Sequence, residues 1–489
     1  MVRARGRTAD GAEALRAPLA SLPASLPIPT LAPSRGQYRN VDLALCPPGS
    51  KSLANRALLL AGLASGRSII TGLPAVAEDV RVMLDAIAAL GAGVSVRGDR
   101  AEILGVGGRW PASDVTLNLR NAGTATRFLA AASLLARGPV TIDGSPRMRQ
   151  RPIGQLAGII RALGGAVEFL GDEGCPPLRI TPPTTPAAPS APITIPTTLS
   201  GQFISAVLLV APWLPGPGGV TLKLTGEVTS ASYIAMTLGL LGRLGADVRS
   251  SHDLRVVRVA GPPPAAFDLV LEADASAATY WWGLGAMLPG ASIRVAGIEP
   301  DSLQGDSRFP DLLARMGARV IRGKPGESWV GVAGPAGLSP VLADLSDMPD
   351  AAMTLAAVAC FAPGTSILRG LRTLRVKESD RVEAMCRELT KVGVRVEHPV
   401  SGDADAITLT PPPGGLPERA DAPPVEFETY DDHRMAMSLA LIGLRRPNVR
   451  ILNPACVGKS YPGFWADLAR VVECKPRRAD KGRPPGGPP

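Results

Sequence analysis

The chain is poor in the residues that build metal sites, disulfide frameworks and membrane spans. Its 489 residues include 4% aromatics, three histidines and six cysteines, and no two cysteines form a CxxC pair. Neither a zinc site nor a disulfide framework is therefore expected. No apolar run reaches the roughly 18 residues that a spanning helix needs, and the best run, 203–214, is interrupted by Ser205 and Pro212. These absences exclude a membrane-spanning protein and favour a globular one.

The charge of the chain is concentrated at its two ends. The net charge is +9, but residues 1–38 hold five Arg against Asp10 and Glu13, and residues 475–489 hold five Lys and Arg against Asp480. The body keeps only +2, so the basic pI says little about a nucleic-acid surface. We expect both ends to be disordered extensions, with an organelle transit peptide as the alternative for residues 1–38. Otherwise a cytoplasmic location is expected.

Between these ends, one pattern recurs about every 70 to 80 residues. Each unit has a polar cluster, an apolar helix, a β-branched strand, an amphipathic helix and a Val-rich strand. The apolar helices open near Gly49, Asn121, Ser200, Ala273, Met348 and Asp431. Five of the second helices end at a glycine stop, namely Gly91, Gly164, Gly245, Gly317 and Gly393. Six such units predict an α/β fold of two domains, each with three units around buried inner helices.

The helix openings carry cations where a helix prefers other residues. Lys51 and Arg56 open the first inner helix, Arg127 follows in the second, and Arg434 opens the last. A cation at a helix N-terminus opposes the dipole by up to about 1 kcal/mol, so stability alone favours Asp, Ser or Thr there. A bound phosphate or carboxylate removes this conflict. If the openings converge, they predict a site for a small, multiply anionic ligand.

Each of these residues also has a purely structural interpretation. Lys51 and Arg56 are equally explained as solvated surface charges. Asn121, Ser200 and Asp350 are equally explained as helix caps. The position shared by these residues at successive helix starts, more than any one of them, favours a functional interpretation.

Two familiar motifs do not fit. The Gly-Ser-Lys-Ser string at 49–52 is no P-loop, because Ala44 and Ser50 stand where that motif has Gly. The Asp-Asp-His string at 431–433 has no second His nearby, so His433 is expected to be an ordinary hydrogen-bonded residue rather than a metal ligand.

Eight strings, taken in order, resemble the signature of the 5-enolpyruvylshikimate-3-phosphate synthase family, the enolpyruvyl transferases of the shikimate pathway. The strings, which run in register from about Cys46 to Leu468, are PGSKSLANRALLLAGL, RNAGTATRFLAA, RMRQRPIGQL, SGQFISAVLL, MPDAAMTLA, RVKESDRVEAM, DDHRMAM and PACVGKSYPGF. The resemblance implies the enolpyruvyl transferase fold, with two domains of three βαβαββ-like units that close over the substrates. It places one domain at 39–50 and 273–474 and the other at 51–272, between the disordered ends 1–38 and 475–489.

The resemblance also implies the reaction and its residues. The family adds the 5-hydroxyl of shikimate 3-phosphate to C2 of phosphoenolpyruvate, protonates C3, and eliminates phosphate. Asp350 would carry out proton transfer at the hydroxyl, and Glu378 would carry it out at the carbon. Lys51 would be an electrostatic partner and an alternative proton donor. The shikimate 3-phosphate side would comprise Lys51, Ser52, Arg56, Ser200, Gln202, Ser230, Asp350 and Lys377. The phosphoenolpyruvate side would comprise Lys51, Gly123, Arg151, Gln202, Arg381, Arg434 and Lys459.

The same resemblance implies that the protein needs no metal or other cofactor and is a monomer. Three residues depart from the family pattern: Gly201 replaces a Ser, Thr373 an Asn, and Phe128 a Pro. These departures bear on affinity, and Phe128 bears on the glyphosate inhibition that the retained Gly123 implies.

Three alternatives stay open at this point. One is the related transferase that acts on UDP-N-acetylglucosamine, although the Cys loop of that enzyme has no counterpart here. Another is a catalytically inactive relative that serves as a binding protein. The third is nucleic-acid binding through the basic ends, which salt-sensitive binding would reveal.

Overall fold

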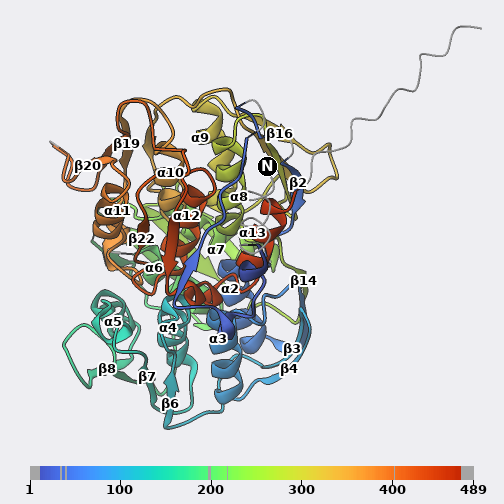
Figure 1. The fold of residues 1–489 in the computed structure, drawn as a ribbon. Helices are drawn as coiled ribbons and strands as arrows, with labels where there is room; N and C mark the ends of the chain where they lie inside the picture. Colours follow the sequence, from blue (N-terminus) through green and yellow to red (C-terminus); the bar gives the residue numbers. More distant parts are fainter. Residues whose placement is uncertain are drawn as a thin grey trace, which may run out of the picture.

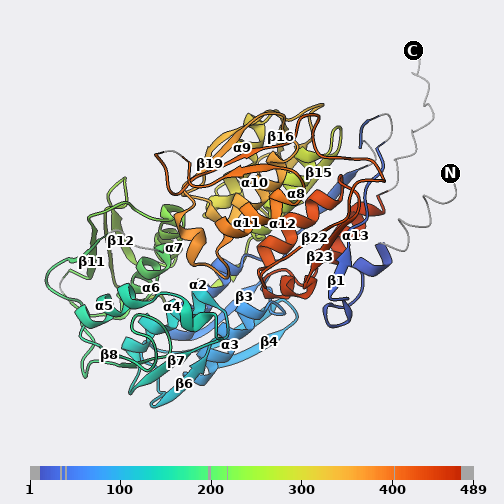
Figure 2. The same cartoon turned by 60° about the vertical axis from the view of Figure 1, so that its left-hand side comes forward.

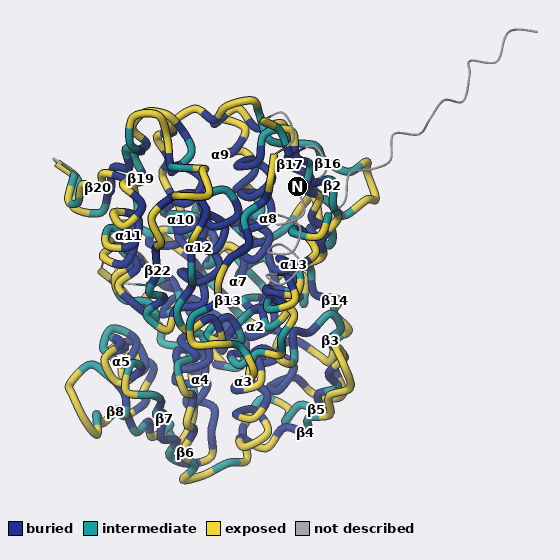
Figure 3. The backbone as a smooth tube through the Cα atoms, in the orientation of Figure 1, coloured by how far each residue is buried: buried dark blue, intermediate teal, exposed yellow. Residues whose placement is uncertain are grey.

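The computed structural model describes residues 12–33, 36–38, 41–196, 200–216, 218–400 and 402–474. In these ranges the buried apolar side chains form two separate cores. One core draws on residues 53–271, and the other on residues 15–45 and 273–471. We call residues 51–272 the lower half and residues 12–50 with 273–474 the upper half, after the light blue to cyan segments that lie at the bottom of Figure 1; the green segments of the lower half overlap the middle of that view. Dark blue, buried backbone fills the interior of each half in Figure 3.

The lower half contains three four-stranded sheets among its described residues, all with one strand order. In the second and third units, in chain order, the first two strands are parallel, the fourth pairs antiparallel with the second, and the third lies at the edge. The first unit has the same arrangement, but the strand in the first position, Asp268–Val270, comes last in the chain. The first unit contains α2 (Lys51–Leu63), β3 (Ser65–Thr71), α3 (Glu78–Ala89), β4 (Gly93–Arg97), β5 (Arg100–Val106) and β14 (Asp268–Val270). The second contains β6 (Val115–Asn118), α4 (Gly123–Ala132), η2 (Ser133–Leu135), β7 (Val140–Asp143), η3 (Met148–Gln150), α5 (Gly154–Ala162), β8 (Ala166–Phe169) and β9 (Leu178–Thr181). The third contains β10 (Ile193–Ile195), α6 (Gly201–Val210), η4 (Ala211–Trp213), β11 (Val220–Leu224), α7 (Ala231–Arg243), β12 (Asp247–Ser250) and β13 (Val256–Ala260).

The upper half repeats this arrangement, with its last sheet completed differently. The fourth unit contains β2 (Asp42–Leu45), α8 (Ala275–Met287), β15 (Ser292–Ala296), η5 (Gly305–Arg308), α9 (Phe309–Arg315), β16 (Arg319–Arg322) and β17 (Trp329–Ala333). The fifth contains β18 (Leu342–Asp344), η6 (Pro349–Ala351), α10 (Ala352–Ala359), β19 (Ser366–Arg369), η7 (Arg372–Val376), α11 (Arg381–Thr390), β20 (Arg395–Glu397) and β21 (Ile407–Thr410). The sixth contains β22 (Val425–Phe427), α12 (His433–Gly443), β23 (Val449–Leu452), η8 (Pro454–Lys459) and α13 (Phe464–Val472).

Six units and their buried inner helices are thus confirmed. Helices α8, α10 and α12 are buried along their whole length, and the remaining inner helices α2, α4 and α6 are buried at all but one residue each. The five predicted stop glycines all adopt positive φ, between 87° and 112°. That left-handed conformation ends a helix without the steric penalty that a Cβ would bring.

The two crossings between the halves run side by side. Gly49 and Ala273 form an antiparallel bridge, and the backbone N–H of Ser50 donates to the carbonyl of Glu272 at 2.8 Å. Beyond this point each crossing chain starts an inner helix, and the Asp274 carboxylate accepts from the backbone N–H of Lys51 at 3.0 Å. Strands β2 and β14, which precede the crossings, complete the fourth and the first sheets. The helix starts of both halves therefore meet at the crossing.

The N-terminal segment corrects one prediction. Residues 12–33 are not a disordered extension: β1 (Ser25–Pro27) pairs antiparallel with β23, and Leu15 and Leu26 are buried in the upper core. Figure 2 shows β1 beside β23, where it takes the place of the missing fourth strand of the last unit. The short 3-10 turn η1 (Leu19–Ser21) packs against η8. The predicted tail 475–489 and residues 1–11 lie outside the described residues.

Within the described ranges, no helix combines the length and apolar character needed to cross a membrane.

Candidate active site

A pocket lies between the two halves, where their helix starts face each other. Apart from Gly123 and Gly201, its lining residues have polar or charged side chains, with cations from both halves. Nearly all the residues that the resemblance implies line it, namely Lys51, Ser52, Arg56, Gly123, Arg151, Ser200, Gln202, Ser230, Asp350, Lys377, Glu378, Arg381 and Arg434. Lys459 lies at its edge, hydrogen-bonded to the carbonyl of Asn121 at 2.6 Å. The predicted convergence of the openings is therefore observed.

Asp350 is surrounded by three cations of the upper half. Its carboxylate lies 2.9 Å from Nη1 of Arg381, 3.0 Å from Nη2 of Arg434 and 3.4 Å from Nζ of Lys377. Tyr233 of the lower half donates its hydroxyl to the same group at 3.1 Å. Burial alone would raise the pKa of Asp350, but the cations hold it well below its usual range. Asp350 is therefore a carboxylate at neutral pH.

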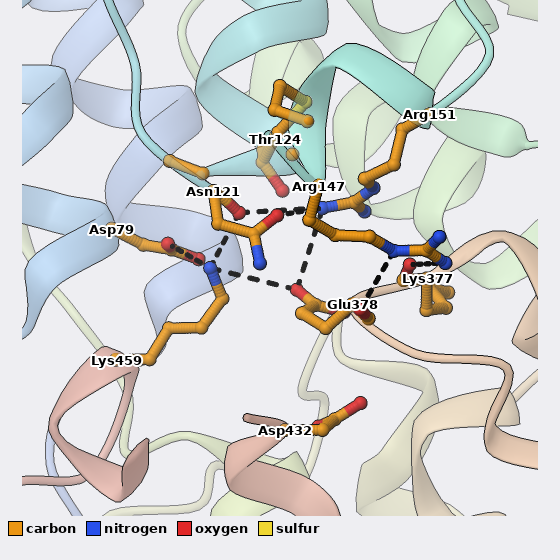
Figure 4. Close-up of polar contacts among 12 residues, drawn as sticks. Asp79, Asn121, Thr124, Arg147, Arg151, Lys377, Glu378, Asp432 and Lys459 are labelled. Carbon is orange, nitrogen blue, oxygen red and sulfur yellow. Dashed lines mark hydrogen bonds and ion pairs between the residues drawn. The ribbon is translucent and has the colours of Figure 1, made fainter. Parts of the chain in front are cut away.

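Glu378 occupies the middle of a second cluster, shown in Figure 4. Its carboxylate lies 3.1 Å from Nη2 of Arg381, 3.8 Å from Nζ of Lys459 and 3.9 Å from Nη1 of Arg151. Burial would raise the pKa of Glu378, but Arg151, Arg381 and Lys459 lower it well below its usual range. Arg147 of the lower half donates to the backbone carbonyls of Lys377 and Glu378 at 3.1 and 3.0 Å. These contacts join the two halves around Glu378.

Asp79 links two of the predicted lysines. It accepts from Nζ of Lys51 at 2.9 Å and from Nζ of Lys459 at 2.8 Å, so a carboxylate of the lower half binds one cation from each half. Its side chain is 4% exposed. Asp79 therefore lies on the buried side of the amphipathic helix α3, where the two lysines bind its carboxylate.

Two arginines of the lower half lack such partners. Arg56 donates only to neutral oxygens, and burial lowers its pKa to about 10. Arg127 donates to the carbonyls of Gly123 and Pro152 and contacts the sulfur of Met148. Burial first, and then the nearby Arg151, lower the pKa of Arg127 well below its usual range. Within the described ranges, neither of these buried guanidiniums has a carboxylate partner.

Small residues shape the wall beside these cations. A Cβ on Gly123 would lie 2.6 Å from Nη2 of Arg151, so glycine allows this guanidinium to reach the helix start. A Cβ on Gly201 would lie 2.9 Å from the carbonyl of Thr229, which leaves little room for the Ser of the family pattern. The buried hydroxyl of Thr373 has no hydrogen-bond partner among the described residues.

The cap interpretation is confirmed for Ser200 but is wrong for Asn121 and Asp350, because Ala122 and Ala351 stand at the cap positions of α4 and α10 and make no side-chain cap hydrogen bond. Ser50 and Asp432 are further caps. Ser50 accepts from the N–H of Leu53, Ser200 from that of Gln202, and Asp432 from that of Arg434. Ser200 nevertheless lines the pocket, so capping and site position coexist.

The hydrogen bonding expected for His433 is not observed. Its ring is buried in the pocket wall, and neither ring nitrogen has a hydrogen-bond partner among the described residues. Burial, Lys51 and Arg434 lower its pKa well below the usual range, so the ring is neutral.

Sequence reasoning missed Asp79, Tyr233 and Arg147. Tyr233 follows Ser230 by one turn in α7, and Arg147 lies in the same string as Arg151, so their motifs were visible. Asp79 gave only the signal of an acid in a first helical turn, which the dipole explains equally well. Among the described residues, no group of three or more His, Cys, Asp or Glu could hold a metal ion.

Comparison with known proteins identifies a family for this chain. The family model for EPSP synthase (3-phosphoshikimate 1-carboxyvinyltransferase) matches residues 37–468. The 3-phosphoshikimate 1-carboxyvinyltransferase of Ralstonia pickettii is 42% identical over 431 residues, which cover 87% of this chain and 96% of the relative. That of Burkholderia multivorans is 40% identical over 444 residues, which cover 90% and 98%.

Solved structures share the fold. An EPSP synthase from Acinetobacter baumannii aligns with a TM-score of 0.71 at 24% identity, over 90% of this chain and 97% of the other. The enolpyruvyl transferase NikO from Streptomyces tendae aligns with a TM-score of 0.68 at 20% identity, over 91% and 96%. The predicted two-domain enolpyruvyl transferase architecture is thereby confirmed as a fold.

Proposed function

Because the chain belongs to the EPSP synthase family, we propose that its pocket transfers the enolpyruvyl group of phosphoenolpyruvate to the 5-hydroxyl of shikimate 3-phosphate. Phosphate is released in the process. The observation that carries this proposal is the position of two buried carboxylates, Asp350 and Glu378, each held by several cations in a pocket between the halves. This arrangement suits substrates that bring negative charge and exchange protons.

Shikimate 3-phosphate is assigned mainly to the lower half. Its site comprises Lys51, Ser52, Arg56, Ser200, Gln202 and Ser230 with Asp350 and Lys377 from the upper half, all of which line the pocket. The buried Arg56, which has only neutral hydrogen-bond partners, supports an anionic group of the substrate there. The hydroxyls and the amide supply directional hydrogen bonds around it.

Phosphoenolpyruvate is assigned to the cluster around Glu378. Its site comprises Lys51, Gly123, Arg151, Gln202, Arg381, Arg434 and Lys459. The planar fork of Arg matches both carboxylate and phosphate, and three of these residues are arginines. Electrostatic stabilisation of the leaving phosphate by Lys and Arg then replaces any need for a metal.

The proton transfers follow from the two carboxylates. Asp350, held as an anion, accepts the proton of the 5-hydroxyl while the oxygen bonds to C2. Glu378 delivers a proton to C3. It takes a proton back from C3 when the bond between C2 and the phosphate oxygen breaks and phosphate leaves. Lys51 stabilises the developing charge beside them, and its Nζ is a second candidate proton donor.

The ionisation of Glu378 couples this chemistry to substrate binding. In the free pocket Arg151, Arg381 and Lys459 hold its pKa low. An anionic substrate on these cations offsets their charge and so raises the pKa of Glu378, because nearby negative charge disfavours a carboxylate. Phosphoenolpyruvate thus prepares the acid that protonates it.

The two cores are proposed to be the two domains, 51–272 and 39–50 with 273–474, that close on the substrates. Hydrogen bonds between the halves at Tyr233 and Arg147 support a closed arrangement. A monomeric state and inhibition by glyphosate remain predictions from the family, and a cytoplasmic location remains a prediction from the sequence.

The test is phosphate release by the purified full chain. We expect release only when shikimate 3-phosphate and phosphoenolpyruvate are both present, and none when UDP-N-acetylglucosamine replaces the former. Glu378→Gln, purified in parallel, should lose almost all release and so exclude a contaminating enzyme. Binding of shikimate 3-phosphate without any release by the wild type would instead identify an inactive, ligand-binding relative.

A further inference from the structure

Arg56 is a buried cation whose charge no carboxylate compensates in the described part of the chain. Its side chain donates to Oγ1 of Thr237, Oγ of Ser205 and the carbonyls of Ser52 and Tyr233, at 2.8 to 3.3 Å. A guanidinium has five N–H groups, and these bonds use four. One N–H on Nη1 remains, and the side chain lines the pocket.

The ring of Phe128 provides the electrostatic attraction to the charge of Arg56 that the neutral oxygens do not provide in full. Cζ of Arg56, from α2, lies 5.1 Å from the ring centroid of Phe128, from α4. The ring is fully buried, so no water competes for its face. A desolvated aromatic face attracts a guanidinium through its quadrupole more strongly than an exposed one does. No other aromatic ring is paired with Arg56 among the described residues.

We propose that Phe128 is a positioning residue for substrate binding: its ring holds the uncompensated guanidinium of Arg56 in the orientation that receives an anionic group of shikimate 3-phosphate. This deepens, and rests on, the proposed function. The hydrogen bonds fix the edge of the guanidinium, whereas the ring fixes its plane. Phe128 itself need not touch the substrate, because it acts through Arg56.

A role in packing alone makes a different prediction. The ring also fills the lower core, so truncating it lowers stability whatever its electrostatic role. Packing loss does not by itself select one substrate over the other. The positioning role therefore appears in the affinity for shikimate 3-phosphate and leaves that for phosphoenolpyruvate unchanged.

The first experiment compares Phe128→Leu with Phe309→Leu. Phe309 is equally buried but lies in the upper core, so it controls for the general cost of a Phe to Leu change. For Phe128→Leu we expect the KM for shikimate 3-phosphate to rise about three- to thirtyfold, with kcat and the KM for phosphoenolpyruvate nearly unchanged. Phe309→Leu should leave all three constants near wild type.

The second experiment keeps the shape of the ring and changes only its quadrupole. Phe128 is replaced in the full chain by phenylalanines with one, two and three ring fluorines, and the Kd of shikimate 3-phosphate is measured by titration calorimetry. We expect the Kd to rise stepwise with each fluorine, since fluorine removes negative charge from the ring face. A Kd that stays constant or falls along the series overturns the inference.

These outcomes separate the inference from the function on which it rests. A wild type that binds shikimate 3-phosphate, together with a flat fluorine series, overturns the role of Phe128 alone. A wild type that binds no shikimate 3-phosphate overturns the proposed function and the inference with it.

Discussion

The buried arginines in the two halves of the pocket have different partners. In the upper half, Arg381 contacts Asp350, Glu378 and Asp432 at 2.7 to 3.1 Å, and Asp350 also contacts Lys377 and Arg434. In the lower half, Arg56 and Arg127 are just as buried but donate to hydroxyls, carbonyls and a sulfur. Arg381 and Arg434 of the upper half are thus paired with carboxylates of the same half, whereas Arg56 and Arg127 of the lower half leave positive charge for a ligand.

This difference fits a division of labour. An internally paired cluster is rigid before substrate arrives, which suits proton transfer at fixed positions. An unpaired guanidinium is costly without a ligand and becomes favourable with one, which suits binding. Lys51 belongs to both groups, since it lies in the lower half and shares Asp79 with Lys459.

The largest effect is expected when a paired charge is removed. Asp432 is fully buried and accepts from Nε and Nη2 of Arg381 at 2.7 and 3.1 Å. Asp432→Asn keeps the size but leaves the guanidinium undercompensated, so the free energy of unfolding should fall by about 3–5 kcal/mol. Urea denaturation measures this. Asp431→Asn is the matched control, because Asp431 is exposed and, in the described part of the chain, its side chain accepts a hydrogen bond only from Asn453. A loss of stability as large in this control would show that the effect does not depend on pairing with Arg381.

A smaller and pH-dependent effect on the free energy of unfolding is expected at Asp306, a buried residue whose carboxyl is influenced by the charge of Asp350. Its carboxyl accepts from the hydroxyl of Ser276, its other oxygen has no partner among the described residues, and burial and Asp350 raise its pKa to about 7. The folded state therefore favours the protonated acid. The stability this gives is complete below the ordinary pKa near 4 and is lost as the pH rises to about 7.

Asp306→Asn, which cannot ionise, isolates that contribution. Its free energy of unfolding relative to wild type should rise by about 2 to 4 kcal/mol between pH 4 and pH 8. Urea midpoints of both proteins at a series of pH values give this difference. Parallel pH profiles for the two proteins would show that Asp306 does not titrate with a raised pKa.

The smallest effect is expected when an unpaired cation is removed. Arg127→Met deletes a buried charge and leaves only the carbonyls of Gly123 and Pro152 without a donor. The loss of hydrogen bonds and the relief of desolvation oppose each other, so the free energy of unfolding should change by about 1 kcal/mol or less. The same urea assay applies. A loss of stability as large as that of Asp432→Asn would mean that the charge of Arg127 is compensated by the protein itself, which contradicts the comparison.

Most of the architecture could be predicted from local sequence, because the repeat is local. A stop glycine predicts a left-handed backbone at a helix end, and an apolar helix predicts its own burial. Both predictions were confirmed. The N-terminal strand could not be found in this way. Ser25–Pro27 lies in a Pro- and Ala-rich segment, and its pairing partner is Leu452–Arg450, more than 400 residues away.

The site shows the same limit. Motifs at helix starts indicated which residues converge, because a cation there is locally unfavourable. The burial of Asp79 depends on Lys459, which comes from the other half, and no local pattern reports it. The distinction between paired and unpaired cations is equally a property of the assembled pocket, since Arg381 and Arg56 look alike in sequence.

Steady-state kinetics of Arg56→Met beside Glu378→Gln test the division between the two halves most directly. The account predicts that Arg56→Met raises the KM for shikimate 3-phosphate about tenfold or more while kcat changes little. It predicts that Glu378→Gln lowers kcat by about 10²- to 10⁴-fold while that KM changes little. An equal fall in kcat for both variants, or a rise in KM confined to Glu378→Gln, would contradict it.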